Sequence, residues 1–433
     1  MRIEIPRECE RVGAVQIYGL QKVYELDGGA DFGYEEDSKR EVIRRISSEA
    51  LYERQKNMAI VVPVKNERLK LIEGVLVGIP HACQIIVVSN SPRGPVDRFQ
   101  IEKEAITNFC KFTNKRVTVV HQKDPGVAKA IELAGYTELL GEDGLVNSGK
   151  AEGMIMGTLL AKLLGSKYIG FVDSDNYFPG AVHEYVQEYA AGFEMFDTDR
   201  TFVRISWNSK PKVMENSLFF AKWGRSSVHS NRTLNRLLTH FSGYETEVVK
   251  TGNAGEHALT LDLALNIEYA SGYAVETHHF VNLIEMWGGI LPPEDPDKMR
   301  HKATICQIES RNPHLHESKG DEHVEDMIDA SLSVVYNSPL CPELLRREPK
   351  DGEVSLYRSR NHMEDFLVAA REGRDPACPV EVGHRSNTVC VLHHASMKLG
   401  GAAIDWDPKR EQLVGDPSAK PIIEIPMREP WTI

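Results

Sequence analysis

The sequence of 433 residues contains no apolar run of about 18 residues, so no membrane-spanning helix is expected. Its first residues, MRIEIPRECERVG, lack the apolar segment of a signal peptide. Positive charge is also scarce, since 51 Lys and Arg against 63 Asp and Glu give a formal net charge of -12. A broad surface for nucleic acid or anionic membrane is therefore not expected, although a local cationic pocket is compatible with this balance.

Cysteines are few and scattered, and no two of them form a CxxC pair. Their number, seven, is odd, so neither a disulfide framework nor a cysteine-based zinc site is expected, and a reducing, cytoplasmic location is predicted. The apolar and charged fractions, 41% and 26%, are those of an ordinary soluble globular protein. The chain is long enough for about two or three domains.

Continuous apolar runs that alternate with helical patterns predict an open α/β sheet of buried parallel strands. Strands are predicted over 58–64, 84–90, 116–121 and 168–172, and helices over 69–77, 99–112 and 150–164. Farther along, the predicted elements are a helix over 181–192, a strand over 201–207, a helix over 258–265, a strand over 272–283 and a helix over 323–340. Residues 35–48 are predicted to be helical, 309–317 to form a polar loop, and the chain beyond about 343 to be irregular.

Polar tips follow three of the predicted strands, at 63–67, 89–91 and 173–176. In open α/β sheets, ligands bind beyond the carboxyl ends of the strands, so these tips are expected to converge in space. Each tip taken alone is equally compatible with a turn or a helix cap. The occurrence of all three after buried strands favours a binding site.

Asp173 and Asp175 stand two residues apart directly after the strand at 168–172. Two carboxylates at this spacing can both face one divalent cation, or one can bind the cation and the other a ribose. Hard cations prefer oxygen ligands, and Mg²⁺ commonly bridges a protein carboxylate and a substrate diphosphate. The alternative is a capped turn, because the tripeptide DxD is common in turns.

Two further groups could complete such a site. His314 or His316, in the polar loop, could add an imidazole to a cation shell that Asp175 begins, and a mixed shell of this kind suits Mn²⁺, Zn²⁺ or Co²⁺ as well as Mg²⁺. Both histidines could equally be surface residues. Glu256 could orient a sugar hydroxyl or stabilise positive charge at an anomeric carbon, or it could simply complement the dipole of a first helical turn.

Cationic side chains occur in polar contexts rich in small residues, where they could hold a phosphate. Lys150 follows Ser148 and Gly149 at a predicted helix start, without the GxxxxGK[ST] pattern of a P-loop. The other candidates are Lys65, Arg225, Arg232 and His229. Solvated surface charge is the alternative for each.

Several long motifs together resemble the mannosyl-3-phosphoglycerate synthase family. They are VPVKNERLKLIEGVL, IIVVSNS, HQKDPGVA, GKAEGMIMG, FVDSDNYFPGAV, GNAGEHALTLDLAL and IESRNPHLHE, and they span roughly residues 61–317. Members of that family are retaining GT-A glycosyltransferases that move mannose from GDP-mannose to 3-phosphoglycerate on the way to mannosylglycerate, a compatible solute. The resemblance therefore implies a GT-A-type α/β fold with a Rossmann-like, mostly parallel sheet, an acceptor-side subregion and a C-terminal arm.

The resemblance implies a first nucleotide-binding stretch near the start of the sheet. Pro63, Lys65, Asn66 and Glu67 match the motif that receives the guanosine, and Ser89 matches a second nucleotide contact.

It also implies a group of residues around the diphosphate and the transferred sugar. Lys150, Asp173 and Asp175 match residues at the diphosphate, and Glu256 matches the acidic residue near the sugar. Ser174 stands where relatives often have Ala, and its side chain is not expected to matter. Asp175, Glu256 and Lys150 would be the catalytic residues.

The remaining implied residues concern the metal and the acceptor. Asp175 with His314 or His316 would bind a divalent cation, and Mg²⁺, Mn²⁺, Co²⁺ and Zn²⁺ stay open. Arg225, Ser227 and Asn231 are the candidates for binding the acceptor.

Four segments follow from the resemblance: 1–55 packs on the core, 56–180 binds the nucleotide sugar, 181–342 binds the acceptor and completes the metal site, and 343–433 is an arm or lid. A homodimer is implied as well. No nucleophile for a covalent intermediate is evident, so front-face attack within an ion pair is expected.

Three alternatives stay open. A glucosyl-3-phosphoglycerate synthase would use the same scaffold with a glucose donor. A sugar-phosphate nucleotidyltransferase usually has a glycine-rich loop after its first strand, but residues 63–68 contain no glycine. A non-catalytic sugar-nucleotide binder would not need the carboxylates and histidines.

Overall fold

The computed structural model describes residues 1–26, 43–176, 178–196, 198–214, 217–221, 225–292, 301–317, 321–342, 362–414 and 417–423; within these ranges the side chains of 210–214, 217–221, 225, 316, 317, 321 and 362 are not described. The chain divides into two compact units, Met1–Arg346 and Arg347–Ile433, which are described separately below.

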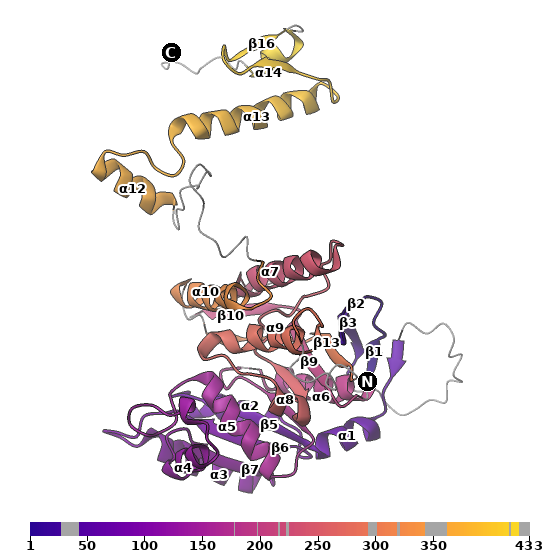
Figure 1. The fold of residues 1–433 in the computed structure, drawn as a ribbon, viewed down its shortest axis with the longest axis vertical. Helices are drawn as coiled ribbons and strands as arrows, with labels where there is room; N and C mark the ends of the chain where they lie inside the picture. The colour runs from indigo at the N-terminus through magenta and orange to yellow at the C-terminus, as the bar shows by residue number, and fades with distance from the viewer. Residues whose placement is uncertain are drawn as a thin grey trace. The chain divides into compact units, whose positions relative to one another are not determined.

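A mixed sheet of eleven strands forms the centre of the first unit (Figure 1). Its order is β4-β1-β3-β13-β9-β12-β8-β5-β6-β7, with β2 paired to β3. The strands are β1 Arg2–Glu4, β2 Cys9–Val12, β3 Val15–Glu25, β4 Ile43–Arg45, β5 Met58–Val64, β6 Gln84–Ser89, β7 Arg116–His121, β8 Tyr168–Phe171, β9 Thr201–Trp207, β12 His257–Thr260 and β13 Ala303–Ser310. A smaller sheet has the order β11-β10-β14, from Ser217–Ala221, Lys210–Met214 and His316–Glu317.

The central strands run parallel in two blocks that β12 joins. In the first block β8, β5, β6 and β7 are parallel neighbours, and in the second β3, β13 and β9 are. β12 is antiparallel to β8 on one side and to β9 on the other. The predicted α/β class is confirmed, and the carboxyl ends of β5, β6 and β8 lie at one edge of the sheet.

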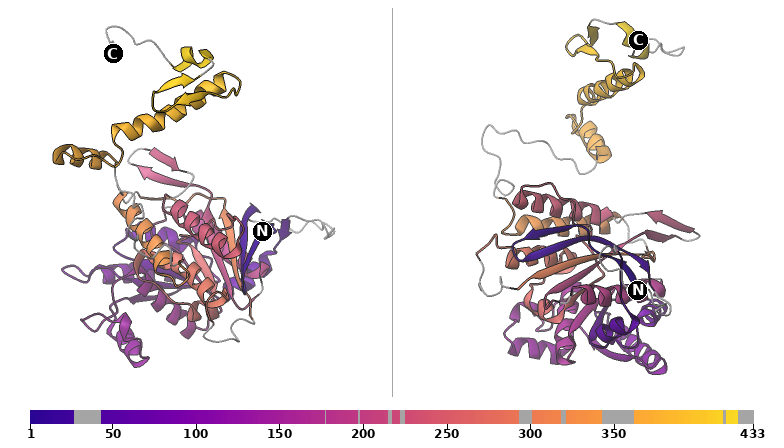
Figure 2. Two further views of the ribbon diagram at one scale, coloured as in Figure 1. Left: turned by 45° about the horizontal axis from the view of Figure 1, so that its top comes forward. Right: turned by 90° about the vertical axis from the view of Figure 1, so that its right-hand side faces the viewer.

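Helices cover both faces of the sheet (Figure 2). The helices pack on the sheet through two clusters of buried apolar side chains. One cluster contains side chains of α1, α2, α3 and α6, and the other contains side chains of α4, α5, α7, α8, α9 and α10. The bounds are α1 Ser48–Lys56, α2 Leu69–Gly78, α3 Arg98–Phe112, α4 Pro125–Leu133, α5 Lys150–Leu163, α6 Pro179–Met195, α7 Arg225–Ser242, α8 Leu261–Asn266, α9 Val275–Trp287 and α10 Asp321–Asn337.

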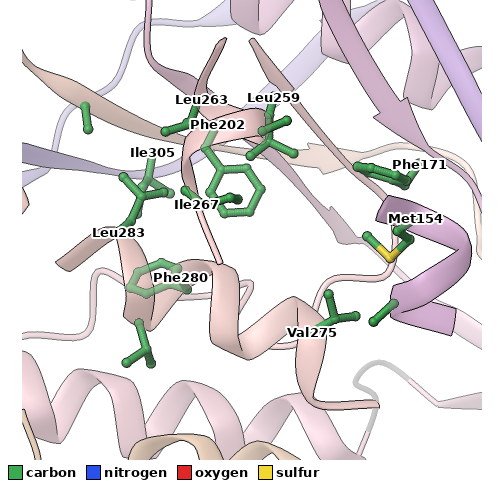
Figure 3. Close-up of a cluster of buried hydrophobic side chains, with 14 of the residues drawn as sticks. Met154, Phe171, Phe202, Leu259, Leu263, Ile267, Val275, Phe280, Leu283 and Ile305 are labelled. Carbon is green, nitrogen blue, oxygen red and sulfur yellow. The ribbon is translucent and has the colours of Figure 1, made fainter. Parts of the chain in front are cut away.

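Strands contribute alternate side chains to the two clusters, as the pleat requires. Ile60 and Val62 of β5 belong to one cluster, and Val61 to the other. Figure 3 shows Phe202 of β9 in the same cluster as Phe280 of α9.

Most of the strands and helices predicted in the first unit are confirmed. The predictions over 58–64, 116–121 and 201–207 match β5, β7 and β9, while β6 and β8 each end one residue earlier than predicted. The helices predicted over 69–77, 99–112, 150–164, 181–192 and 323–340 match α2, α3, α5, α6 and α10 within a few residues.

The prediction of a strand over 272–283 was wrong. A short 3₁₀ turn, Gly272–Ala274, leads directly into α9. Its buried residues Val275, His279, Leu283 and Trp287 recur at helical spacing, and the aromatic and β-branched residues between them disguised this period.

The predicted helix over 258–265 was partly wrong, because its first half is strand β12. Ala258 and Leu259 face opposite sides of the sheet, and the helix α8 begins only at Leu261. A short apolar run that is buried on both faces does not distinguish strand from helix.

Smaller corrections concern the flanking segments. Within the predicted helix over 35–48, Ile43–Arg45 is strand β4 and α1 begins at Ser48, whereas 35–42 lie outside the described residues. The predicted loop over 309–317 begins inside β13, and His316–Glu317 forms β14.

The second unit was predicted to be irregular, which was wrong for its described residues. These form α12 His362–Glu372, α13 Val380–Lys398, the hairpin of β15 Asp405–Asp407 and β16 Gln412–Val414, a 3₁₀ turn Pro417–Ala419 and α14 Lys420–Ile423. Its buried apolar side chains, among those described, are Ala369, Ala395 and Ala419.

All seven cysteines are in described parts of the chain and are free thiols. Within those same parts, no helix has the length and apolar character needed to cross a membrane.

Two buried histidines, His257 and His279, adjoin the site described below. Burial lowers the pKa of His257 to about 3 and that of His279 to well below its ordinary value, so both imidazoles are neutral in the fold. Neither ring nitrogen of His279 has a hydrogen-bond partner among the residues that the structure describes.

Acid is expected to destabilise the fold through these histidines. Each imidazole of the unfolded chain takes up a proton below about pH 6.5 while the folded form stays neutral, so stability is lost as the pH falls, by about 2 kcal/mol per residue at about pH 5. His279→Phe should remove about half of this loss between about pH 7.5 and about pH 5, as measured by urea unfolding. An equal loss in the variant and the wild type would contradict the explanation.

Candidate active site at the carboxyl ends of the strands

The carboxyl end of β8 places two carboxylates at the edge of the sheet. The Val172 backbone N–H still donates to the Val61 carbonyl at 3.1 Å, and the chain then bends away from the sheet. Asp173 and Asp175 are partly exposed, whereas Ser174 between them is 7% exposed and buried. The strand thus ends with its carboxylates accessible from the edge and its serine turned into the protein.

Lys150 lies between two carboxylates from different elements. Its Nζ atom is 2.8 Å from Asp173 Oδ1 and 2.8 Å from Glu276 Oε1. Burial alone would lower the pKa of the Lys150 ammonium, but the two carboxylates outweigh this effect and raise the pKa well above its ordinary value. Lys150 is therefore charged at any physiological pH, and it joins the start of α5, the end of β8 and the start of α9.

Glu276 was not among the predicted site residues. It stands in the first turn of α9, in a segment whose helical character the sequence pattern did not reveal. A correct assignment of the α9 start would have flagged an acidic first turn there.

Gly255 packs against the pair of Lys150 and Asp173. A Cβ atom at Gly255 would lie 2.8 Å from Asp173 Oδ2 and 3.8 Å from Lys150 Nζ. The chain can approach the carboxylate this closely only without a side chain. The next residue, Glu256, is fully buried and immediately precedes β12.

Buried polar side chains hold the loop that leads to Gly255. Arg204 of β9 donates from Nε and Nη2 to the Thr251 carbonyl, at 2.9 and 2.5 Å, and from Nη1 to the Glu276 carbonyl at 2.9 Å. Burial lowers the pKa of Arg204 to about 9. Gln307 accepts from the Lys250 N–H at 2.8 Å and from the Thr251 hydroxyl at 2.7 Å. One guanidinium thus links the loop to the helix that carries Glu276.

His314 is buried on the other side of Glu256. Its Nδ1 atom lies 3.7 Å from Glu256 Oε1 and 3.2 Å from the Tyr185 hydroxyl. The imidazole stacks on Trp207, with ring centroids 4.2 Å apart and planes at 15°. His314 therefore lies beside Glu256 in the site. Neither residue spacing nor hydrophobic periodicity in the sequence predicts this contact.

The amide of Asn176 defines how the His314 ring is used. Asn176 Oδ1 accepts from the Phe178 N–H at 2.9 Å, so its Nδ2 group, 3.3 Å from His314 Nδ1, is the donor. Nδ1 is therefore an acceptor toward Asn176, and in the neutral ring the proton sits on Nε2.

The predicted metal residues are only partly described. His316 lies in β14, but its side chain is not described. Among the described residues, no group of three or more His, Cys, Asp and Glu side chains is arranged to hold a metal. A carboxylate such as that of Asp175 and an imidazole such as that of His314 are both donor types that suit a divalent cation.

The tip of β5 is exposed where nucleotide contacts are predicted. Lys65 and Asn66 are exposed, while Pro63 and Glu67 are partly buried. Asn66 has a φ of 57°, and its N–H donates to Ser91 Oγ at 2.7 Å. The turn at this tip is thus tied to the end of the neighbouring strand.

Ser89, the other predicted nucleotide contact, is fully buried at the end of β6. Its hydroxyl donates to Glu102 Oε2 at 2.9 Å, and Ser91 donates to Oε1 of the same carboxylate at 2.8 Å. The Ser89 side chain therefore has its hydrogen bond within the protein.

The predicted acceptor residues lie in the first turns of α7. The Arg225 side chain is not described, and Ser227 is partly buried. Asn231 donates to the Lys250 carbonyl at 3.0 Å and accepts from the Gly252 N–H at 2.6 Å. Its amide therefore anchors the loop before Gly255.

A separate cavity of about 700 Å³ lies between α9, α10 and the segment before α9. The described residues that line it include none of the predicted site residues.

Comparison with known proteins identifies two regions. A family model described as "Mannosyl-3-phosphoglycerate synthase (osmo_MPGsynth)" matches residues 5–364, and one described as "Oxidoreductase family, C-terminal alpha/beta domain" matches residues 352–433. Mannosyl-3-phosphoglycerate synthase from Pyrococcus furiosus is 46% identical over 348 residues, which cover 80% of this chain and 87% of that protein. The protein of the same name from Aeropyrum pernix is 34% identical over 360 residues, covering 82% and 90%.

Solved structures give a weaker likeness. Mannosyl-3-phosphoglycerate synthase from Rubrobacter xylanophilus is 15% identical with a TM-score of 0.41, covering 66% of this chain and 76% of that one. Glucosyl-3-phosphoglycerate synthase from Mycobacterium tuberculosis, in complex with Mg²⁺ and uridine-diphosphate, is 18% identical with a TM-score of 0.44, covering 67% and 84%. These values carry no argument about the site.

Gly255→Ala is expected to displace the Asp173 carboxylate from Lys150. The added methyl group would overlap Asp173 Oδ2, and strain of this kind costs about 1–3 kcal/mol of unfolding free energy. Gly74→Ala in α2 is the control, because a Cβ atom there meets only Pro179 at 3.6 Å. Urea unfolding of both variants compares the two positions, and equal stability would refute the close packing at Gly255.

Proposed function

This chain belongs to the mannosyl-3-phosphoglycerate synthase family, and on that premise we propose that it transfers mannose from GDP-mannose to 3-phosphoglycerate with retention at the anomeric carbon, releasing GDP. The match to the family model and the two relatives support the sugar and the acceptor. The GT-A fold, the nucleotide and the stereochemistry are parts of the proposal.

The ion pairs of Lys150 are the observation that carries the proposal. A charged ammonium at the first residue of a helix, whose N-cap residue Gly149 offers no side-chain cap, suits the diphosphate of a nucleotide sugar. It would stabilise the negative charge that develops on departing GDP. Asp173 and Glu276 keep Lys150 in place at 2.8 Å each before the donor binds.

The charge balance of the site supports a divalent cation. Two carboxylates, those of Asp173 and Glu276, contact one ammonium, and a diphosphate would add further negative charge. A divalent cation held by Asp175 and by His314 or His316 would supply the missing positive charge and act as a Lewis acid. For Nε2 of His314 to bind a cation, the ring proton must move to Nδ1, where Tyr185 and Glu256 are the neighbouring acceptors.

The remaining residues would bind and orient the two substrates. The exposed tip with Lys65 and Asn66 would receive the guanosine, and Arg225 with Ser227 would receive the phosphate and carboxylate of the acceptor. The buried carboxylate of Glu256 would stabilise positive charge at the anomeric carbon in the transition state. The acceptor hydroxyl would attack from the face that GDP leaves.

A homodimer and a cytoplasmic location accompany this proposal. Both derive from the sequence alone.

Release of GDP from GDP-mannose in the presence of Mg²⁺, with and without 3-phosphoglycerate, tests the proposal. The wild-type protein should release GDP only when the acceptor is present. Asp175→Ala should reduce that rate by about 100-fold or more, because it removes the carboxylate proposed to hold the cation. Asp326→Ala is the control, since Asp326 is an exposed aspartate on α10.

Two outcomes would contradict the proposal. Equal rates for Asp175→Ala and the wild type would exclude the carboxylate from the reaction. Acceptor-independent release of GDP would make the protein a hydrolase of the donor.

A further inference from the structure

We propose that Glu184 is a positioning residue for the reaction, because its carboxylate fixes the loop that carries His314. Glu184 belongs to α6 and is fully buried. Its Oε1 atom accepts from the Arg311 backbone N–H at 2.7 Å, and its Oε2 atom accepts from the Asn312 N–H at 2.8 Å. Both carboxylate oxygens therefore hold the segment between β13 and β14.

Hydrogen bonds from consecutive N–H groups to one carboxylate orient a loop strongly. Two parallel bonds to one side chain define the direction of the chain more closely than a single bond does. Because Asn312 stands two residues before His314, the geometry of these bonds limits where the imidazole can lie.

The imidazole itself is positioned by neighbouring residues of the same elements. Tyr185, which follows Glu184 in α6, contacts His314 Nδ1 through its hydroxyl at 3.2 Å. The His314 N–H donates to the Ser209 carbonyl at 3.0 Å, and the ring stacks on Trp207 at the end of β9. Consecutive residues of α6 thus hold the backbone of the loop and the ring that the loop presents.

Glu188 lies one turn farther along α6 and is a second buried acidic residue next to Glu184. It is fully buried, and burial together with the neighbouring Glu184 and Glu309 raises its pKa well above the ordinary value. These effects therefore favour the neutral form of Glu188. Other titratable groups that face it are Tyr185 and Tyr189 on α6 and Cys306 on β13.

The pair offers a matched comparison between two isosteric substitutions. Glu184→Gln places an amide NH₂ group against a backbone N–H, so one of the two loop bonds is lost. Glu188→Gln replaces a protonated carboxyl by a neutral amide of the same shape and leaves the loop bonds intact. Both side chains are equally buried and are on the same helix.

The effect of Glu184 on catalysis rests on the proposed function. The test therefore measures both mannosyl transfer and the fluorescence of Trp207, which needs no substrate. For Glu184→Gln, kcat should fall by about 10- to 100-fold while KM for GDP-mannose changes by less than about 3-fold. Trp207 emission, obtained as the difference from the Trp207→Phe form of each protein, should change because the stacked imidazole moves. Glu188→Gln should leave both readouts near those of the wild type.

Two results would overturn the inference. One is unchanged kcat and unchanged Trp207 emission in Glu184→Gln. The other is a loss of kcat in both variants that parallels their loss of thermal stability, which would mean that Glu184 only stabilises the fold. If the wild type transfers no mannose but the Trp207 emission of Glu184→Gln alone changes, the positioning of the loop is supported and the proposed function fails.

Discussion

The ammonium of Lys150 is the point at which the parts of the site meet. Its two ion pairs join α5, the end of β8 and the start of α9. Lys150 and Glu276 are 126 residues apart in the chain. Two carboxylates around one partly buried ammonium leave the assembly negative. In the proposed reaction the donor is also anionic, and a divalent cation bound at the site would offset this negative charge.

A second layer of polar groups holds the loop above this ion pair. Arg204 is fully buried with backbone carbonyls as its partners at Thr251 and Glu276, and Gln307 holds the same loop from β13. A buried guanidinium is expensive compared with apolar packing. Its five donors, however, can bind a loop and a helix start at once, which an apolar side chain cannot do. This directional bonding keeps Gly255 close to Asp173.

The sequence was most informative where a single local pattern decides the structure. The polar tips at 63–67, 89–91 and 173–176 could be predicted because buried parallel strands read as continuous apolar runs followed by polar turns. Glu276 could not, because it begins a helix whose aromatic and β-branched residues resemble a strand. Arg204 could not either, because nothing in a strand sequence reveals which backbone carbonyls its side chain will reach. The role of Glu184 depends on a loop 127 residues away.

The helices of the C-terminal region were also not predicted from the sequence. The described helix α13 exposes large apolar side chains such as Val380 and Val389, so no clear amphipathic period marks it in the sequence. The match of residues 352–433 to a model from an oxidoreductase family distinguishes this region from the synthase region that precedes it. The chemistry argued above uses residues of the first unit alone.

The most direct test of the account is to identify the product formed from 3-phosphoglycerate with GDP-mannose, GDP-glucose and UDP-glucose in parallel. The account predicts that GDP-mannose is the preferred donor and that NMR of the product shows an α-linked mannosyl group, with the anomeric configuration of the donor retained. Preferred transfer from a glucose donor, or a product with inverted configuration, would contradict it.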